Sequence, residues 1–107
     1  MATVVSLINL KGGVAKTTTT VAVAQMLDSE FGKRVLVVDL DPQTNATVVL
    51  IGDKRWKQLN EQRQTVAQLF RDALDGHQRV FELSRSIQKS VGDIGDVRRV
   101  DLLPSSL

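Results

Sequence analysis

Apolar residues in the first forty positions form two continuous runs and one helical repeat. Residues 4–8 (VVSLI) and 35–38 (VLVV) are rich in β-branched residues, as is typical of parallel strands buried on both faces. Between these runs, apolar residues recur at helical spacing from Val21 to Phe31, and Gly32 is a typical helix stop. A strand, a helix and a strand in this order predict a right-handed βαβ unit with parallel strands.

The middle of the chain carries weaker signals. Residues 45–51 fit either a short helix or a strand, because periodicity does not separate the two in so short a run. Residues 52–64 are polar and fit either a loop or an exposed helix, and residues 77–99 are ambiguous.

Two further elements are predicted in the second half. Apolar residues from Val66 to Leu74 follow the spacing i, i+3, i+4, i+7, i+8 behind a capping-box sequence that starts at Thr65, which predicts a helix closed by Gly76. The apolar run that ends before Pro104 predicts a third strand followed by a loop.

Composition narrows the class of protein. The 107 residues are 42% hydrophobic and 24% charged with a net charge of +2, which describes a globular segment rather than a disordered one. The absence of cysteine excludes a disulfide framework, a thiolate metal site and a thiol nucleophile within these residues. No apolar run approaches the ~18 residues of a membrane span, and the first residues do not resemble a signal peptide, so we expect a cytoplasmic protein.

The segment between the first run and the helix is suited to phosphate binding. Two adjacent glycines allow a sharp turn that points N–H groups inward, and the helix start adds free N–H groups and the positive end of its dipole. Lys16 would bring positive charge to β- and γ-phosphates, and the Thr17 hydroxyl can ligate Mg²⁺. The standard pattern G-x-x-x-x-G-K-[ST] is not met, because Leu10 and Ala15 stand in place of its glycines.

Two carboxylates follow the second run. Asp39 and Asp41 come directly after residues 35–38, at the carboxyl end of a predicted parallel strand, where open α/β sheets bind ligands. Facing Lys16 and Thr17 from the first loop, they predict a site for Mg²⁺ and for an oriented water molecule.

These segments resemble the deviant Walker A box and the second box of the ParA/MinD superfamily of P-loop ATPases. The matching stretches are KGGVAKT from Lys11 and DLDPQTNAT from Asp39, and the second, with LLPS from Leu102, resembles the ParA/Soj branch of partition ATPases. The resemblance implies an α/β fold: a P-loop NTPase-like parallel sheet with flanking helices, of which residues 1–107 would be the N-terminal part of a single domain. Ala15 departs from the glycine usual in this box.

The resemblance also implies roles for single residues. Lys16 would bind the β- and γ-phosphates, Lys11 would reach the nucleotide of the other subunit as an arginine finger does, and Asp41 would orient the attacking water. Thr17 and, through water, Asp39 would hold Mg²⁺. The implied nucleotide-binding residues are Lys11, Gly12, Gly13, Val14, Ala15, Lys16, Thr17 and Thr18.

The implied function is an ATP-driven dimerisation switch for chromosome or plasmid partitioning. ATP and Mg²⁺ would be its cofactors; its partners would be a second copy, non-specific DNA and a ParB-like activator, on the nucleoid in the cytoplasm, with no membrane. The alternatives are a MinD-like membrane-associated division-site ATPase and a non-catalytic nucleotide-binding module. The presence of Lys11, Lys16 and both aspartates favours catalysis.

The resemblance places a Walker B strand and an adenine-binding loop after Leu107. In the superfamily the Walker B strand usually lies beside the phosphate-loop strand, so we expect residues 4–8 to present an unpaired apolar edge. We also expect the 107 residues alone not to hydrolyse ATP.

Trp56 lies in a basic cluster with Lys54, Arg55 and Lys57. The simpler interpretation is a solvated helix or loop face, and stacking on a nucleobase is the alternative.

Overall fold

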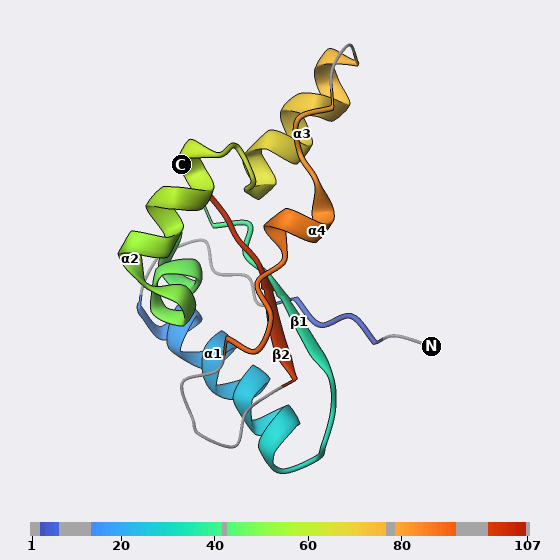
Figure 1. The fold of residues 1–107 in the computed structure, drawn as a ribbon. Helices are drawn as coiled ribbons and strands as arrows, with labels where there is room; N and C mark the ends of the chain where they lie inside the picture. The colour runs from blue at the N-terminus through green and yellow to red at the C-terminus, as the bar shows by residue number, and fades with distance from the viewer. Residues whose placement is uncertain (1–2, 7–13, 42, 77–78, 92–98, 107) are drawn as a thin grey trace.

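The structure is a computed structural model that describes residues 3–6, 14–41, 43–76, 79–91 and 99–106 (Figure 1). For residues 14 and 15 it describes the backbone alone. The elements in chain order are α1 (Val14–Ser29), β1 (Val35–Val38), α2 (Asn45–Glu61), α3 (Val66–Asp75), α4 (Leu83–Ser86) and β2 (Val100–Leu103).

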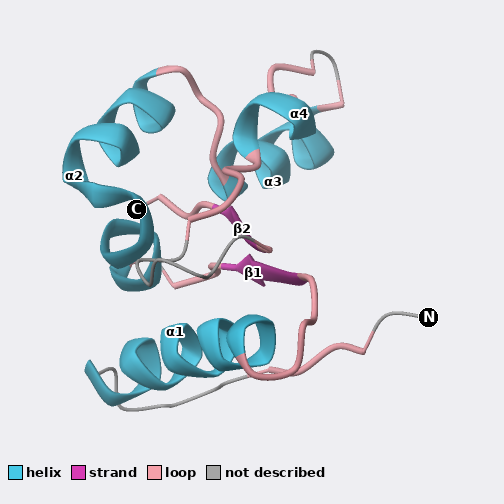
Figure 2. Ribbon diagram, turned by 60° about the horizontal axis from the view of Figure 1, so that its bottom comes forward, coloured by secondary structure: helices cyan, strands magenta, loops and turns pink. Residues whose placement is uncertain are grey.

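The described residues form a parallel sheet of two strands with helices on both sides. β1 and β2 pair in register from Val35 opposite Val100 to Val38 opposite Leu103. Figure 2 shows α1 on one side of the sheet and α3 and α4 on the other. This arrangement confirms the predicted fold class, and the strands predicted at 35–38 and before Pro104 are confirmed.

The core is divided between the two sides of the sheet. Because successive strand residues point to opposite faces, Leu102 and Leu103 belong to different clusters. The cluster on the α1 side consists of Val21, Ala24, Val37, Leu50, Val100 and Leu102. The cluster on the α3 side consists of Val66, Phe81 and Leu103.

The predicted helix after the phosphate loop is confirmed as α1, with one correction at its end. Gly32 has a φ of +62° and donates its N–H to the Asp28 carbonyl at 2.9 Å, which ends the helical hydrogen bonding. Phe31 therefore lies beyond the helix and is 62% exposed, although the repeat predicted that it belongs to the apolar helix face.

The strand predicted at residues 4–8 is wrong for the residues described. Residues 3–6 form no strand, and Val4 and Val5 are 87% and 73% exposed. A strand needs a neighbour for its N–H and C=O groups, and β1 pairs only with β2 among the described residues. Residues 7 and 8 lie outside the described residues.

The ambiguous middle of the chain is helical. α2 runs from Asn45 to Glu61, so the helix alternative is correct for residues 45–51 and for most of 52–64. Gly52 interrupts the helix with φ 82° and ψ 158°, values that only glycine adopts readily. The glycine therefore joins two helical segments that point in different directions.

The helix predicted at Val66–Leu74 is confirmed as α3, but the capping box is wrong in its bonding. Thr65 occupies the N-cap position, yet its hydroxyl donates to the Ser106 hydroxyl at 2.8 Å rather than accepting a helix N–H. The side chain of Gln68 donates to Asp72 at 2.8 Å instead of returning to Thr65. Most of the apolar stripe of α3 is open to solvent, since Phe70 and Leu74 are 55% and 88% exposed.

Candidate functional site

The predicted site residues that the structure describes lie at the start of α1 and at the carboxyl end of β1. Lys16, Thr17 and Thr18 belong to the first turns of α1, and Asp39 and Asp41 follow β1. Lys11, Gly12 and Gly13 lie outside the described residues, and Val14 and Ala15 begin the helix.

The structure brings the phosphate-loop lysine to the strand-end aspartate. Lys16 Nζ lies 3.8 Å from Asp41 Oδ2, and the two side chains are 23% and 16% exposed. This is a loose ion pair between groups that keep some contact with water, so it is readily exchanged for a stronger anionic partner. The sequence predicted this opposition of lysine and aspartate, and the structure contains it.

The Asp39 carboxylate is buried and accepts hydrogen bonds from the loop after β1 and from the start of α2. Its Oδ2 accepts the Thr47 N–H at 2.9 Å and the Thr47 hydroxyl at 2.6 Å, and its Oδ1 accepts the Asp41 N–H at 3.0 Å. Thr47 is in the first turn of α2, where backbone N–H groups have no partner inside the helix. Asp39 therefore caps α2 from the end of β1 and places a negative charge at the positive end of the helix dipole.

Asp41 is held by its backbone and by one carboxylate oxygen. Its carbonyl accepts the Thr44 N–H at 2.9 Å and the Ser105 hydroxyl at 2.8 Å, and its Oδ1 accepts the Gln43 N–H at 2.9 Å. The other oxygen, Oδ2, is the one that faces Lys16. The loop thus fixes Asp41 while one oxygen remains directed toward the start of α1.

Two residues behind the aspartates were missed by sequence reasoning. Thr47 is fully buried. Its hydroxyl donates to Asp39 and accepts the Ser105 N–H at 3.0 Å, so it joins the two residues. Both residues fall inside stretches that carry the family resemblance, but no local pattern indicates which atoms they contact. The only sequence signal for these two residues was a hydroxyl-bearing residue type within those stretches.

Trp56 contacts this network rather than presenting its ring N–H to solvent. The indole Nε1–H donates to the Ser105 carbonyl at 3.0 Å. Its basic neighbours are engaged on the surface: Arg55 donates to Gln88 at 3.0 Å, and Lys57 pairs with Asp53 at 3.0 Å. The interpretation as a solvated helix face fits the charged neighbours, while Trp56 itself joins α2 to the end of β2.

The described part of the site fits phosphate and a hydrated Mg²⁺ ion. Lys16 has a partly exposed ammonium group with only a loose partner. A carboxylate offers about four lone-pair positions, and Asp39 uses three of them, which leaves Oδ1 one position for a metal-bound water. Thr17 and Thr18 line a hollow of about 240 Å³ that lies between α1 and Val49 of α2.

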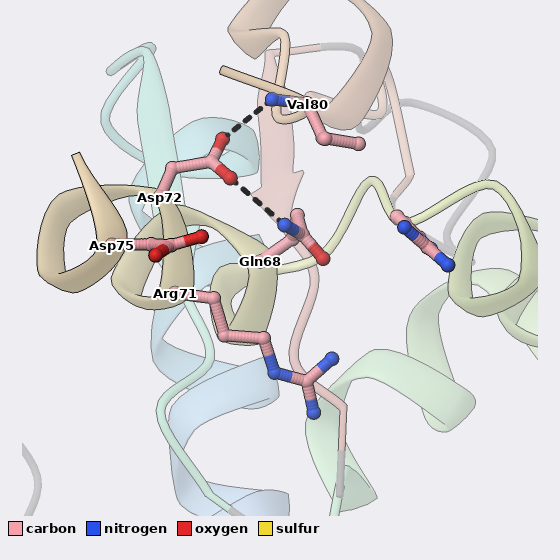
Figure 3. Close-up of a pocket in the computed structure, with 6 residues that line it drawn as sticks. Gln68, Arg71, Asp72, Asp75 and Val80 are labelled. Atoms are coloured by element: carbon pink, nitrogen blue, oxygen red, sulfur yellow. Dashed lines mark hydrogen bonds between the residues drawn. The ribbon is translucent and has the colours of Figure 1, made fainter. Parts of the chain in front are cut away.

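A second hollow, of about 340 Å³, lies beside α3 and away from these residues (Figure 3). Figure 3 shows the Asp72 carboxylate directed at the Gln68 amide and the Val80 N–H. The N–H of Phe81 donates to the same carboxylate at 2.7 Å, and this bond, followed by that from Gln68, lowers the pKa of Asp72. These bonds connect α3 to the segment that follows it, so we assign this hollow a structural role.

Comparison with known proteins identifies the family of the chain. The sequence model of a family described as an AAA domain matches residues 2–107. The chain belongs to this family. No solved structure gave a significant match to this chain.

Three relatives support the resemblance to ParA/Soj-type partition ATPases. The chain is 60% identical over 43 residues to the chromosome-partitioning ATPase Soj of Thermus thermophilus, across 40% of this chain and 17% of the relative. It is 53% identical over 47 residues to the sporulation initiation inhibitor protein Soj of Bacillus subtilis, across 44% of this chain and 18% of the relative. It is 44% identical over 52 residues to plasmid partition protein A of Escherichia coli, across 44% of this chain and 13% of the relative. The predicted relationship to this branch is confirmed, over short stretches that cover less than a fifth of each relative.

Among the helices that the structure describes, none combines the length and apolar character needed to cross a membrane.

Proposed function

We propose that the chain is part of a single P-loop ATPase domain that binds ATP with Mg²⁺ and hydrolyses it to drive DNA partitioning. The observation that carries the proposal is the approach of Lys16 Nζ to Asp41 Oδ2 at the carboxyl end of β1. A cation at a helix start can bind phosphates, and a carboxylate opposite it at a strand end can orient a water molecule for phosphoryl transfer. The relatives named for partitioning support the biological role.

Each described residue has a distinct task in this proposal. Lys16 exchanges its loose contact with Asp41 for the β- and γ-phosphates, where its charge is more strongly paired. Asp41 is then free to orient the attacking water through Oδ2. Asp39 holds a Mg²⁺-bound water through its remaining lone pair, and Thr17 provides a hydroxyl ligand from α1. Bound Mg²⁺ supplies charge stabilisation for the transferring phosphoryl group.

The finer proposal concerns assembly. Lys11 acts across a dimer formed with ATP, the dimer binds DNA without sequence preference, and a ParB-like protein stimulates hydrolysis on the nucleoid in the cytoplasm. The physical reason for a lysine acting from the other subunit is that positive charge is most effective where negative charge develops on the transferring group.

ATP hydrolysis by the complete protein, measured with and without DNA, tests this function. We expect slow Mg²⁺-dependent hydrolysis and DNA binding only in the presence of ATP. Hydrolysis without any DNA binding would contradict the partitioning role and leave the phosphate site standing. Failure to bind ATP would contradict the whole proposal.

Lys11→Ala separates nucleotide binding from assembly. If Lys11 acts on the other subunit's nucleotide, the variant binds ATP as a monomer but loses ATP-dependent dimerisation and hydrolysis. Calorimetry and light scattering measure the two properties, and Lys33→Ala, an exposed lysine just past the end of α1, is the control. Dimerisation and turnover equal to those of the parent would make Lys11 an ordinary loop residue.

A further inference from the structure

Ser105, two residues after the end of β2, uses its polar groups on the loop after β1 and on α2. The residue is 3% exposed. Its hydroxyl donates to the Asp41 carbonyl at 2.8 Å, its N–H donates to the Thr47 hydroxyl at 3.0 Å, and its carbonyl accepts the Trp56 indole N–H at 3.0 Å. The hydroxyl also lies 3.5 Å from the Ser106 carbonyl, which is too far to compete with the shorter bond.

The bond from Ser105 differs in range from the other bonds that hold Asp41. The N–H groups of Gln43 and Thr44, which also bind Asp41, come from residues two and three positions along the chain. The Ser105 hydroxyl comes from a residue 64 positions away, at the end of the neighbouring strand. Local turns set the shape of the loop, whereas this bond sets the position of the loop relative to the sheet.

We infer that Ser105 is a positioning residue for Asp41, acting through the Asp41 carbonyl on the orientation of the carboxylate toward the phosphate site. The inference rests on the proposed function, since it assigns the alignment of that same site. Displacement of a group by about 1 Å can cost a large factor in the rate of a reaction that needs alignment. Binding of phosphate depends on Lys16 and on the start of α1, neither of which has a hydrogen bond to Ser105 among those of the described residues.

Trp56 and Thr47 keep Ser105 in place from the other side. Trp56 lies in α2 beyond Gly52, and Thr47 lies in the first turn of the same helix. Both therefore hold the backbone of Ser105 against α2, so the Ser105 hydroxyl is presented to Asp41 from a fixed backbone. The position of Asp41 therefore depends, through Ser105, on how α2 packs on the sheet.

The test compares Ser105→Ala with Ser105→Thr and Ser106→Ala in the complete protein. Ser105→Ala removes the hydroxyl, Ser105→Thr restores it, and Ser106→Ala removes a neighbouring hydroxyl whose partner is Thr65. We expect Ser105→Ala to lower kcat about tenfold, the factor that corresponds to one net hydrogen bond, with the Kd for ADP unchanged within about twofold. Ser105→Thr should recover most of kcat, and Ser106→Ala should keep it.

Fluorescence of Trp56, the single tryptophan of these 107 residues, separates positioning from unfolding. Its partner is the backbone carbonyl of Ser105, which Ser105→Ala retains, so the emission maximum should not move. A red shift together with weaker ADP binding would show a merely structural role and overturn the inference, as would an equal loss of kcat in Ser106→Ala.

The two proposals fail in different ways. If the parent protein hydrolyses ATP and Ser105→Ala hydrolyses it equally fast, the positioning role is wrong and the proposed function stands. If the parent protein binds no ATP, the proposed function is wrong and the positioning role falls with it.

Discussion

Asp39 and Asp72 are two aspartates that each accept three hydrogen bonds from the chain, yet they lie in very different places. Asp39 binds Asp41 and Thr47 at the end of β1. Asp72 binds Gln68 within its own helix and the N–H groups of residues 80 and 81. Both carboxylates connect segments that would otherwise separate.

The difference lies in what stands beside each carboxylate. Next to Asp39, the Lys16–Asp41 pair provides a cation and a second carboxylate, whose Oδ2 is held by a loose ion pair. Beside Asp72 lies a hollow of mixed charge, and the carboxylate itself is committed to its backbone donors. An aspartate with many hydrogen bonds is thus not by itself a sign of function. A loosely paired lysine and aspartate at the end of a strand are the better sign.

Among the aspartate variants, Asp41→Ala should have the largest effect on activity, because it removes the carboxylate that faces Lys16. Hydrolysis should fall by at least about 100-fold, as expected when a group that orients or deprotonates water is lost. ATP binding should persist, since Lys16 loses a competitor rather than a phosphate contact. Light scattering with ATP should show persistent dimers, and normal turnover would assign the water-orienting role to another residue.

Asp39→Ala should have the largest effect on stability. The change leaves the Asp41 N–H and both donors of Thr47, a fully buried residue, without their acceptor. We expect a loss of about 2–6 kcal/mol in the free energy of unfolding, since each of the two buried Thr47 donors left without an acceptor costs about 1–3 kcal/mol. Urea unfolding measures it against Asp53→Ala, which removes only an exposed ion pair with Lys57. Equal losses in the two variants would show that Asp39 is not a cap.

Asp72→Asn should have a smaller effect on the free energy of unfolding, and the effect should depend on pH. The pKa of Asp72 is lowered in the folded state, chiefly by the Phe81 N–H, so its contribution to stability is present above the ordinary aspartate pKa and lost as pH falls through the folded value. Asp72→Asn should therefore be less stable than the parent at pH 7, and the difference should shrink below about pH 4. Urea unfolding at several pH values measures this, and a difference that is constant with pH would contradict it. ATP binding should be unaffected.

Local pattern predicted the elements that form from neighbouring residues. The strand before Asp39, the helix after the phosphate loop and the helix from Val66 all depend on apolar spacing, and all are present. The strand expected at residues 4–8 depends on pairing with a neighbouring strand, which a local pattern does not predict. The capping box was wrong because the Thr65 hydroxyl binds Ser106, a residue 41 positions away. Phe31 lies outside α1 because Gly32, one residue later, adopts a positive φ that ends the helix before it.

The candidate site follows the same division. The opposition of Lys16 and Asp41 was predicted from the place of the aspartates directly after a parallel strand, where open α/β sheets bind ligands, and it is present although residues 3–6 form no strand. The roles of Thr47 and Ser105 were not predicted, because they arise from side-chain hydrogen bonds between residues 58 and 64 positions apart. Such contacts depend on how α2 packs on the sheet, which no periodicity specifies.

Titration of ATP into the Lys16→Ala variant of the complete protein tests the central claim most directly. Lys16 is the cation that the structure places opposite Asp41, and its removal should abolish measurable ATP binding by calorimetry. The control, Lys33→Ala, removes an exposed lysine just past the other end of α1 and should bind ATP as the parent does. ATP affinity unchanged in Lys16→Ala would contradict the assignment of a phosphate site between α1 and β1.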